Sequence, residues 1–118
     1  GAFVPTEAEE RRLTALLQED TSLNISLVPI WLSKADVEDF YNGFSNASLW
    51  PLLHWMTPYA RFKKAWADSY RRVNELFADA VLSTARSDDI VWVQDFHLFL
   101  VPQLLRRKGE ALAVAPRE

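Results

Sequence analysis

The sequence predicts an α/β protein, in which helices flank a parallel sheet. Two short apolar segments, residues 23–30 and 90–93, have the composition of strands, and helical patterns surround both. The resulting order is helix, strand, helices, strand, helix and the start of a further strand, which is typical of parallel crossovers. A chain of 118 residues is long enough for one domain and too short for two.

The first helix is predicted over residues 7–19. Thr6 and Glu9 have the spacing of a capping box. The apolar residues that follow are spaced for one face of a helix: Leu13, Leu16 and Leu17. Residues 23–30 then alternate apolar and polar before becoming wholly apolar, which predicts a strand that is half-buried at first. Pro29 places the end of this strand near a sheet edge.

A second helix is predicted to begin at a Ser33 cap and to end or bend at Gly43. Its apolar stripe consists of Val37, Phe40 and Tyr41. A short helix is expected around Pro51. Because proline disfavours the α conformation in the residue before it, the chain should be interrupted at Trp50.

The longest helical pattern covers residues 59–83. Its apolar residues recur at steps of three and four: Phe62, Trp66, Tyr70, Val73, Phe77, Ala80 and Val81. Residues 90–93 are wholly apolar, as expected of a strand buried on both faces of a parallel sheet. Residues 97–108 form another helical pattern that should stop at Gly109. Residues 111–114 are predicted to begin a strand.

The composition excludes several classes of protein. Without cysteine the chain has no disulfide and no thiolate metal site, and two histidines alone do not build a zinc site. A net charge of −3 disfavours nucleic-acid binding. No apolar run approaches the roughly 20 residues that span a bilayer, and no signal peptide is visible. A soluble, cytoplasmic protein is expected. Three glycines are too few for a Gly-rich nucleotide loop.

The strongest local signal for a binding site is the run from Gln94 to His97, between a predicted strand and a predicted helix. In open α/β sheets ligands bind at the carboxyl ends of strands, which is where Asp95 and His97 lie. A cap of the next helix explains Asp95 equally well on position alone. For His97 alone, a structural role is favoured.

Tyr41 and Trp50 are candidates for a second cluster. On one straight α-helix, nine residues of separation would point them in opposite directions. They can line one pocket only if the chain breaks between them. The alternative, which the spacing alone favours, is that both aromatic residues belong to the core and lie on two short helices.

Several motifs occur in order with compatible spacing: YNGFSNASLWPLLH at residues 41–54, YRRVN at 70–74, FAD at 77–79, VWVQDFHL at 91–98 and VP at 101–102. Together they closely resemble the N-terminal domain of the trehalose-6-phosphate synthase family, from about Leu27 to Gly109. Members of this family are retaining glucosyltransferases of the GT-B type, with two Rossmann-like domains facing each other across a cleft. The resemblance implies that residues 1–118 are a single, partial N-terminal domain on the acceptor side.

The resemblance implies transfer of glucose from a nucleotide-glucose, expected to be UDP-glucose, to glucose 6-phosphate. The product would be trehalose 6-phosphate, formed without metal or cofactor. It implies that Tyr41 and Asp95 contact the acceptor and that Trp50 shapes the acceptor pocket and selects the anomer. Gln94 and His97 would support the site.

Two departures from the family pattern are visible: Gln94 stands where a histidine is usual, and Phe96 where a tyrosine is usual. The expected partner is the remainder of the enzyme with its C-terminal domain, and association of identical chains is an open hypothesis. Because the donor-binding residues of that second domain are missing here, the chain alone is expected to be inactive. Two alternatives are a glucosylglycerol-phosphate synthase-like enzyme and a catalytically inactive, stand-alone regulatory or interaction domain.

Overall fold

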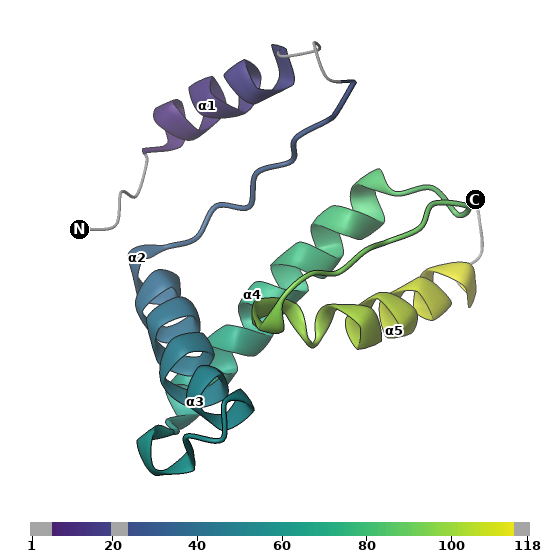
Figure 1. Cartoon of the computed structure of the whole chain (residues 1–118). Helices are drawn as coiled ribbons and strands as arrows, with labels where there is room; N and C mark the ends of the chain where they lie inside the picture. Colours follow the sequence, from purple (N-terminus) through teal and green to yellow (C-terminus); the bar gives the residue numbers. More distant parts are fainter. Residues whose placement is uncertain (1–5, 20–23, 115–118) are drawn as a thin grey trace.

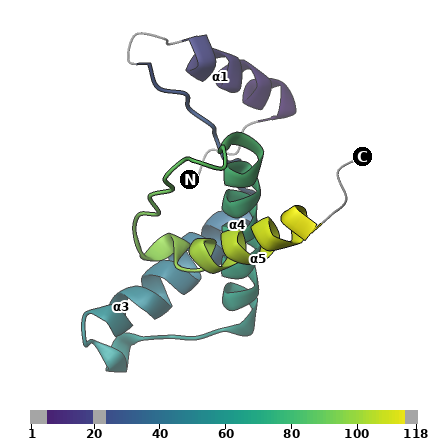
Figure 2. The same ribbon diagram turned by 90° about the vertical axis from the view of Figure 1, so that its right-hand side faces the viewer.

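The structure, a computed structural model, describes residues 6–19 and 24–114, with side chains up to residue 110. Its elements in chain order are α1 (Glu7–Glu19), α2 (Lys34–Asp36), the π-helix η1 (Val37–Leu49), α3 (Trp50–Leu53), the 3₁₀ turn η2 (Thr57–Tyr59), α4 (Lys64–Thr84), the 3₁₀ turn η3 (Phe96–Leu98) and α5 (Val101–Val114). The long helix α4 is the centre of the molecule, and η1 and α5 both pack on it (Figure 1). Figure 2 shows α5 crossing α4, with α1 at the far end of an extended segment.

The core lies where η1 meets α4. Phe40, Tyr70 and Val73 are buried there, and the ring centroids of Phe40 and Tyr70 are 5.7 Å apart. Phe44 places its ring 4.6 Å from that of Tyr70. The helical stripe that the sequence predicted in α4 is therefore confirmed at Tyr70 and Val73.

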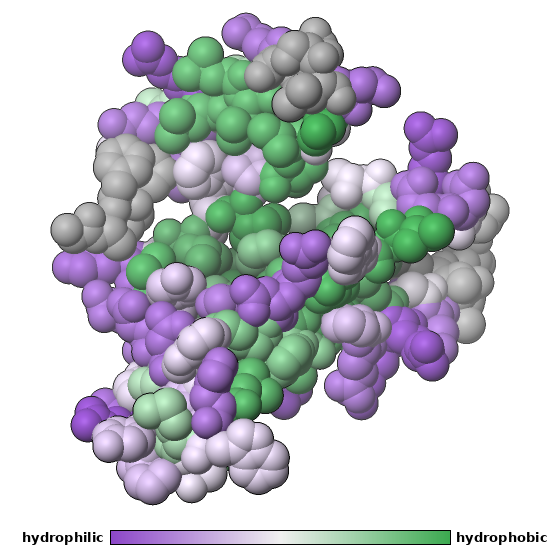
Figure 3. Space-filling view, viewed as in Figure 1, coloured by the Kyte–Doolittle hydropathy of each residue, from purple (hydrophilic) through white to green (hydrophobic). Residues whose placement is uncertain are grey.

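The predicted parallel sheet is absent from the described part of the chain. Residues 25–30 and 90–93 are extended but belong to no strand. Ile90 and Trp92 are 96% and 82% exposed, and apolar surface gathers over the middle of the face in Figure 3. A strand needs a neighbouring strand for its backbone groups, and neither segment has one within the described ranges.

Other predicted boundaries also need correction. The strand predicted at residues 111–114 is wrong, because these residues form the last turn of α5. The helix does not stop at Gly109 but continues past it. The helix expected from residue 59 begins instead at Lys64, because the backbone N–H and carbonyl of Arg61 are bonded to Ala47 and Ser48 of η1. Helix α1 and its Thr6 capping box are as predicted, while position 23 lies outside the described residues. No helix in the described ranges has both the length and the apolar character needed to cross a membrane.

The interruption predicted before Pro51 is not found. Trp50 has helical angles (φ −57°, ψ −52°), and its N–H donates to the carbonyl of Ser45 five residues back. In an α-helix, residue 51 would donate to the carbonyl of Ala47, which proline cannot do. That oxygen accepts the N–H of Arg61 at 2.8 Å instead, so the loop before α4 replaces the missing bond.

Gly43 does not end the helix either. It is buried within η1, where the indole of Trp66 from α4 lies directly against it. A Cβ atom at this position would be 2.7 Å from two indole carbons. The glycine therefore allows the close approach of α4 to η1 and has no role as a stop signal.

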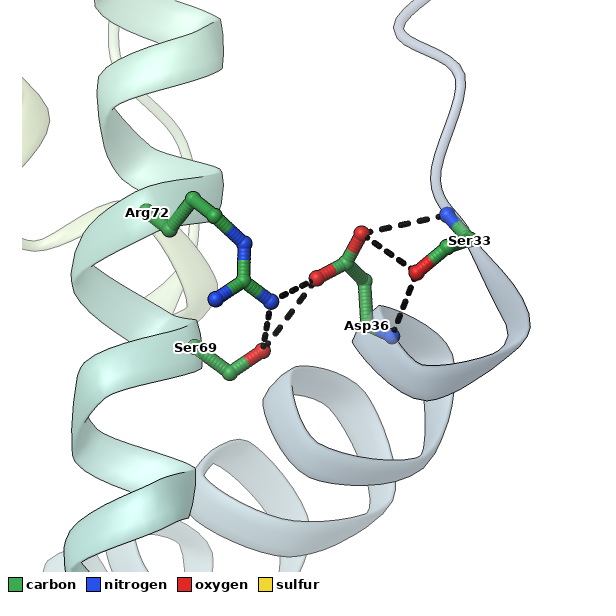
Figure 4. Close-up of polar contacts among 4 residues, drawn as sticks. All are labelled: Ser33, Asp36, Ser69 and Arg72. Atoms are coloured by element: carbon green, nitrogen blue, oxygen red, sulfur yellow. Dashed lines mark hydrogen bonds and ion pairs between the residues drawn. The ribbon is translucent and has the colours of Figure 1, made fainter.

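A polar cluster joins the start of α2 to α4 (Figure 4). Ser33 and Asp36 form a reciprocal capping box, with the Asp36 N–H donating to Ser33 Oγ at 3.1 Å. In return, Oδ2 of Asp36 accepts the Ser33 N–H at 3.1 Å. Oδ1 of Asp36 accepts from Arg72 and from Ser69 Oγ, the latter at 3.5 Å. Burial raises the pKa of the Asp36 carboxyl, but the hydrogen bonds from Arg72 and Ser33 outweigh it and hold the pKa below its usual value.

This depressed pKa predicts acid sensitivity of the α2–α4 contact. A carboxyl with a lowered pKa in the folded state stabilises it at pH values above the unfolded pKa of about 4, and the contribution is lost as the pH falls through the folded pKa. The free energy of unfolding, measured in urea between pH 7 and pH 3, should fall less steeply below about pH 4 in Asp36→Asn than in wild type. Asp68→Asn, which removes an exposed ion pair with Lys64, is the matched control and should keep the wild-type slope. Equal slopes in wild type and Asp36→Asn would contradict the assignment.

Candidate functional site

Aromatic side chains from three elements meet around η3. The Tyr41 ring of η1 stacks on His97, with centroids 5.2 Å apart and planes inclined by 10°. The Trp50 ring, at the start of α3, lies 5.4 Å from Phe96. The ring centroids of the neighbouring residues Phe96 and His97 are 4.1 Å apart. The structure thus brings Tyr41 and Trp50 to the turn that carries Asp95.

The π-helical winding of η1 explains how Tyr41 and Trp50 share a face. In a π-helix each turn holds more residues than an α-turn, because hydrogen bonds span five residues. Nine residues then make about two turns, and the two side chains return to the same side. On an α-helix the two side chains would need a chain break between them to share a face. The change of helix type does the same without a break.

Asp95 occupies an unusual backbone conformation at the end of the extended segment. Its φ is 75° and its ψ 158°, a region that costs a non-glycine residue about 1–3 kcal/mol. Oδ1 accepts the N–H of Phe96 at 2.8 Å, which is the capping role. Oδ2 lies 3.7 Å from Nδ1 of His97, and the side chain is 62% exposed. The carboxylate therefore caps η3 and also faces solvent beside His97.

The supporting residues divide between two sides of the turn. The His97 ring packs near Phe40 and Tyr41, and within the described residues its buried Nε2 has no hydrogen-bond partner. Gln94 instead lines an apolar hollow of about 380 Å³ together with Trp92 and side chains of α4 and α5. The structure brings His97 to the aromatic cluster but does not bring Gln94 to it.

Two further residues contact the turn, and neither was predicted from the sequence to belong to the site. Tyr70 and Asn74 of α4 bond to the backbone of residues 96–100. A buried asparagine on the apolar stripe of a helix was the signal that could have pointed to them, because buried polar groups need partners.

The cluster has the chemistry of a sugar site. Tyr41 and Trp50 are 47% and 48% exposed, and exposed aromatic side chains of this kind suit contact with the apolar side of a pyranose. The Asp95 carboxylate accepts hydrogen bonds from hydroxyl groups. No group of three potential metal ligands comes together anywhere in the described part of the chain.

Comparison with known proteins identifies the family. The sequence model of glycosyltransferase family 20 matches residues 2–115. The chain belongs to this family. A bifunctional trehalose-6-phosphate synthase/phosphatase of Thermoproteus tenax is 42% identical over 107 residues, 91% of this chain and 14% of the relative. A UDP-forming α,α-trehalose-phosphate synthase of Aspergillus niger is 42% identical over 112 residues, 95% of this chain and 22% of the relative.

Solved structures agree with the family assignment. A UDP-forming α,α-trehalose-phosphate synthase from Burkholderia xenovorans, crystallised with glucose 6-phosphate, matches with a TM-score of 0.64 and 37% identity. The match covers 67% of this chain and 18% of that protein. The family 20 chain therefore spans between 14% and 22% of the length of these relatives. About two thirds of it shares the fold of the corresponding part of the Burkholderia xenovorans synthase.

Proposed function

We propose that the chain is the acceptor-side segment of a trehalose-6-phosphate synthase, which transfers glucose from UDP-glucose to glucose 6-phosphate with retention. The observation that carries the proposal is the meeting of Tyr41, Trp50 and Asp95 around η3. The similarity to a UDP-forming synthase crystallised with glucose 6-phosphate supports the choice of substrates.

In this proposal each side chain has a distinct task. The free oxygen of Asp95 accepts a hydroxyl proton of the acceptor sugar, and its negative charge strengthens that bond. Tyr41 contacts the same sugar from η1, while the exposed indole of Trp50 limits the pocket and selects the anomer. His97 supports Tyr41 by stacking. Gln94 lies on the other side of the turn and has no direct task here.

The remainder of the enzyme would complete both the fold and the site. Residues 25–30 and 90–93 are extended (Figure 1), mostly apolar and mostly exposed, which suits strands of a Rossmann-like sheet whose neighbours lie elsewhere in the longer protein. The departing nucleotide diphosphate needs cations that a second domain would supply. The chain by itself is therefore predicted to be inactive. A cytoplasmic location, operation without a cofactor and association of identical chains also stay predictions.

The test uses the full-length protein that contains these residues. With UDP-glucose and glucose 6-phosphate it should release UDP and form trehalose 6-phosphate, identified by mass spectrometry. The 118-residue chain alone should release no UDP in response to glucose 6-phosphate. Faster turnover with glycerol 3-phosphate would favour a glucosylglycerol-phosphate synthase. A natural stop codon directly after Glu118 would favour a stand-alone regulatory or interaction domain instead.

A further inference from the structure

Two buried side chains of α4 hold the backbone of the turn that follows Asp95. The Tyr70 hydroxyl donates to the carbonyl of Phe96 at 2.6 Å and accepts the N–H of Phe99 at 3.1 Å. Tyr70 is 3% exposed. Burial raises the pKa of its phenol, so the hydroxyl keeps the proton that it donates to Phe96.

Asn74, one helical turn further along α4, completes this arrangement. Its side-chain Nδ2 donates to the carbonyl of His97 at 3.0 Å and to that of Tyr70 at 2.9 Å. Its Oδ1 accepts the N–H of Leu100 at 3.2 Å. Asn74 is fully buried, so its amide has little access to water and depends on these partners.

Residues 96–100 therefore depend on α4 for their conformation. Two carbonyls and two N–H groups of this turn are satisfied by just these two side chains. Leaving the fully buried amide of Asn74 without its partners would cost about 1–3 kcal/mol. The conformation of the turn is thus set by α4 as well as by its own sequence.

The 95–100 turn begins at Asp95, the residue with the strained backbone. A non-glycine residue keeps a positive φ only where its surroundings determine the backbone strongly. Asp95 has φ 75°, and the carbonyl bonded by Tyr70 belongs to the very next residue. The ring of Tyr70 also packs on Phe40 and Phe44 of η1, the helix that carries Tyr41. One side chain therefore contacts both halves of the candidate site.

We propose that Tyr70 and Asn74 are positioning residues for acceptor binding, which hold the 95–100 turn so that Asp95 faces the sugar beside Tyr41. The inference rests on the proposed function and extends it to two residues that do not touch the substrate. It separates the two tasks of the buried pair: the Tyr70 ring packs the core, whereas its hydroxyl and the Asn74 amide orient the turn.

Tyr70→Phe tests the inference, because it keeps the ring and removes only the hydroxyl. In the full-length enzyme, KM for glucose 6-phosphate should rise about two- to tenfold, as expected for loss of an ordinary hydrogen bond in the site's support. The KM for UDP-glucose should stay near the wild-type value, because the donor lies on the other domain. Assays are run well below the melting temperature of the variant.

Tyr59→Phe is the matched control, because Tyr59 is an exposed tyrosine of η2. It should leave both KM values unchanged. A second readout is hydrogen exchange of the Phe99 amide, which should become faster in Tyr70→Phe and stay unchanged in Tyr59→Phe. A lower melting temperature with an unchanged KM for glucose 6-phosphate would overturn the inference and leave the proposed function intact. An inactive wild-type enzyme would instead contradict the proposed function itself.

Discussion

Replacing Asp95 with alanine in the full-length enzyme is expected to lower kcat/KM for glucose 6-phosphate about ten- to a hundredfold. A hydrogen bond to a charged group is worth about 1.5–3 kcal/mol, which corresponds to that range. Oδ1 is already used in capping η3, so Oδ2 beside His97 is the atom assigned to the sugar. The measurement is the initial rate of UDP release at varied concentrations of glucose 6-phosphate.

Alanine also removes the cap and is strained at a positive φ, so Asp95→Asn is needed beside it. Asparagine tolerates positive φ and keeps an oxygen for the Phe96 N–H, but it has no charge. Asp95→Asn should therefore lower the turnover rate with little change in the free energy of unfolding. Asp88→Asn, in the exposed 87–88 turn, is the control and should behave as wild type. If both Asp95 variants turn over normally and only Asp95→Ala melts earlier, Asp95 is a capping residue and no more.

Local signals in the sequence were enough to predict much of the helical structure. The predicted capping box at Thr6 and the predicted cap at Ser33 depend on residues three apart, and both are present. The stripe of α4 follows from its own spacing. In the site, Asp95 was open to two interpretations, and the structure gives one oxygen to the cap and leaves the other beside His97.

What the sequence did not predict depends on groups that are distant along the chain. Ala47 and Arg61 are fourteen residues apart, and the Arg61 N–H satisfies the carbonyl to which Pro51 cannot donate. Tyr70 and the 95–100 turn are more than twenty residues apart, so the role of the hydroxyl was invisible in the motif. The sheet could not be confirmed, because strand pairing requires neighbours that the described residues do not supply.

The second large effect is expected from Gly43→Ala, which should lower the free energy of unfolding by about 1–3 kcal/mol, the usual cost of overpacking. The added methyl would lie 2.7 Å from the Cγ and Cδ2 atoms of the Trp66 indole, which are rigid ring atoms close to the backbone of α4. The indole must move, and Lys63 lies over it at 4.8 Å. Alanine gains only about 0.5–1 kcal/mol over glycine within a helix, too little to compensate. Urea unfolding followed by circular dichroism measures the change.

Gly109→Ala is the matched control, because Gly109 is also inside a helix but a Cβ there would meet nothing within 4 Å. It should leave the stability unchanged or raise it by up to about 1 kcal/mol. Combining Gly43→Ala with Trp66→Phe should cost less than the sum of the two single changes, because the smaller ring makes room for the methyl group. Wild-type stability of Gly43→Ala, or strict additivity with Trp66→Phe, would show that the close approach of η1 to α4 does not depend on a glycine.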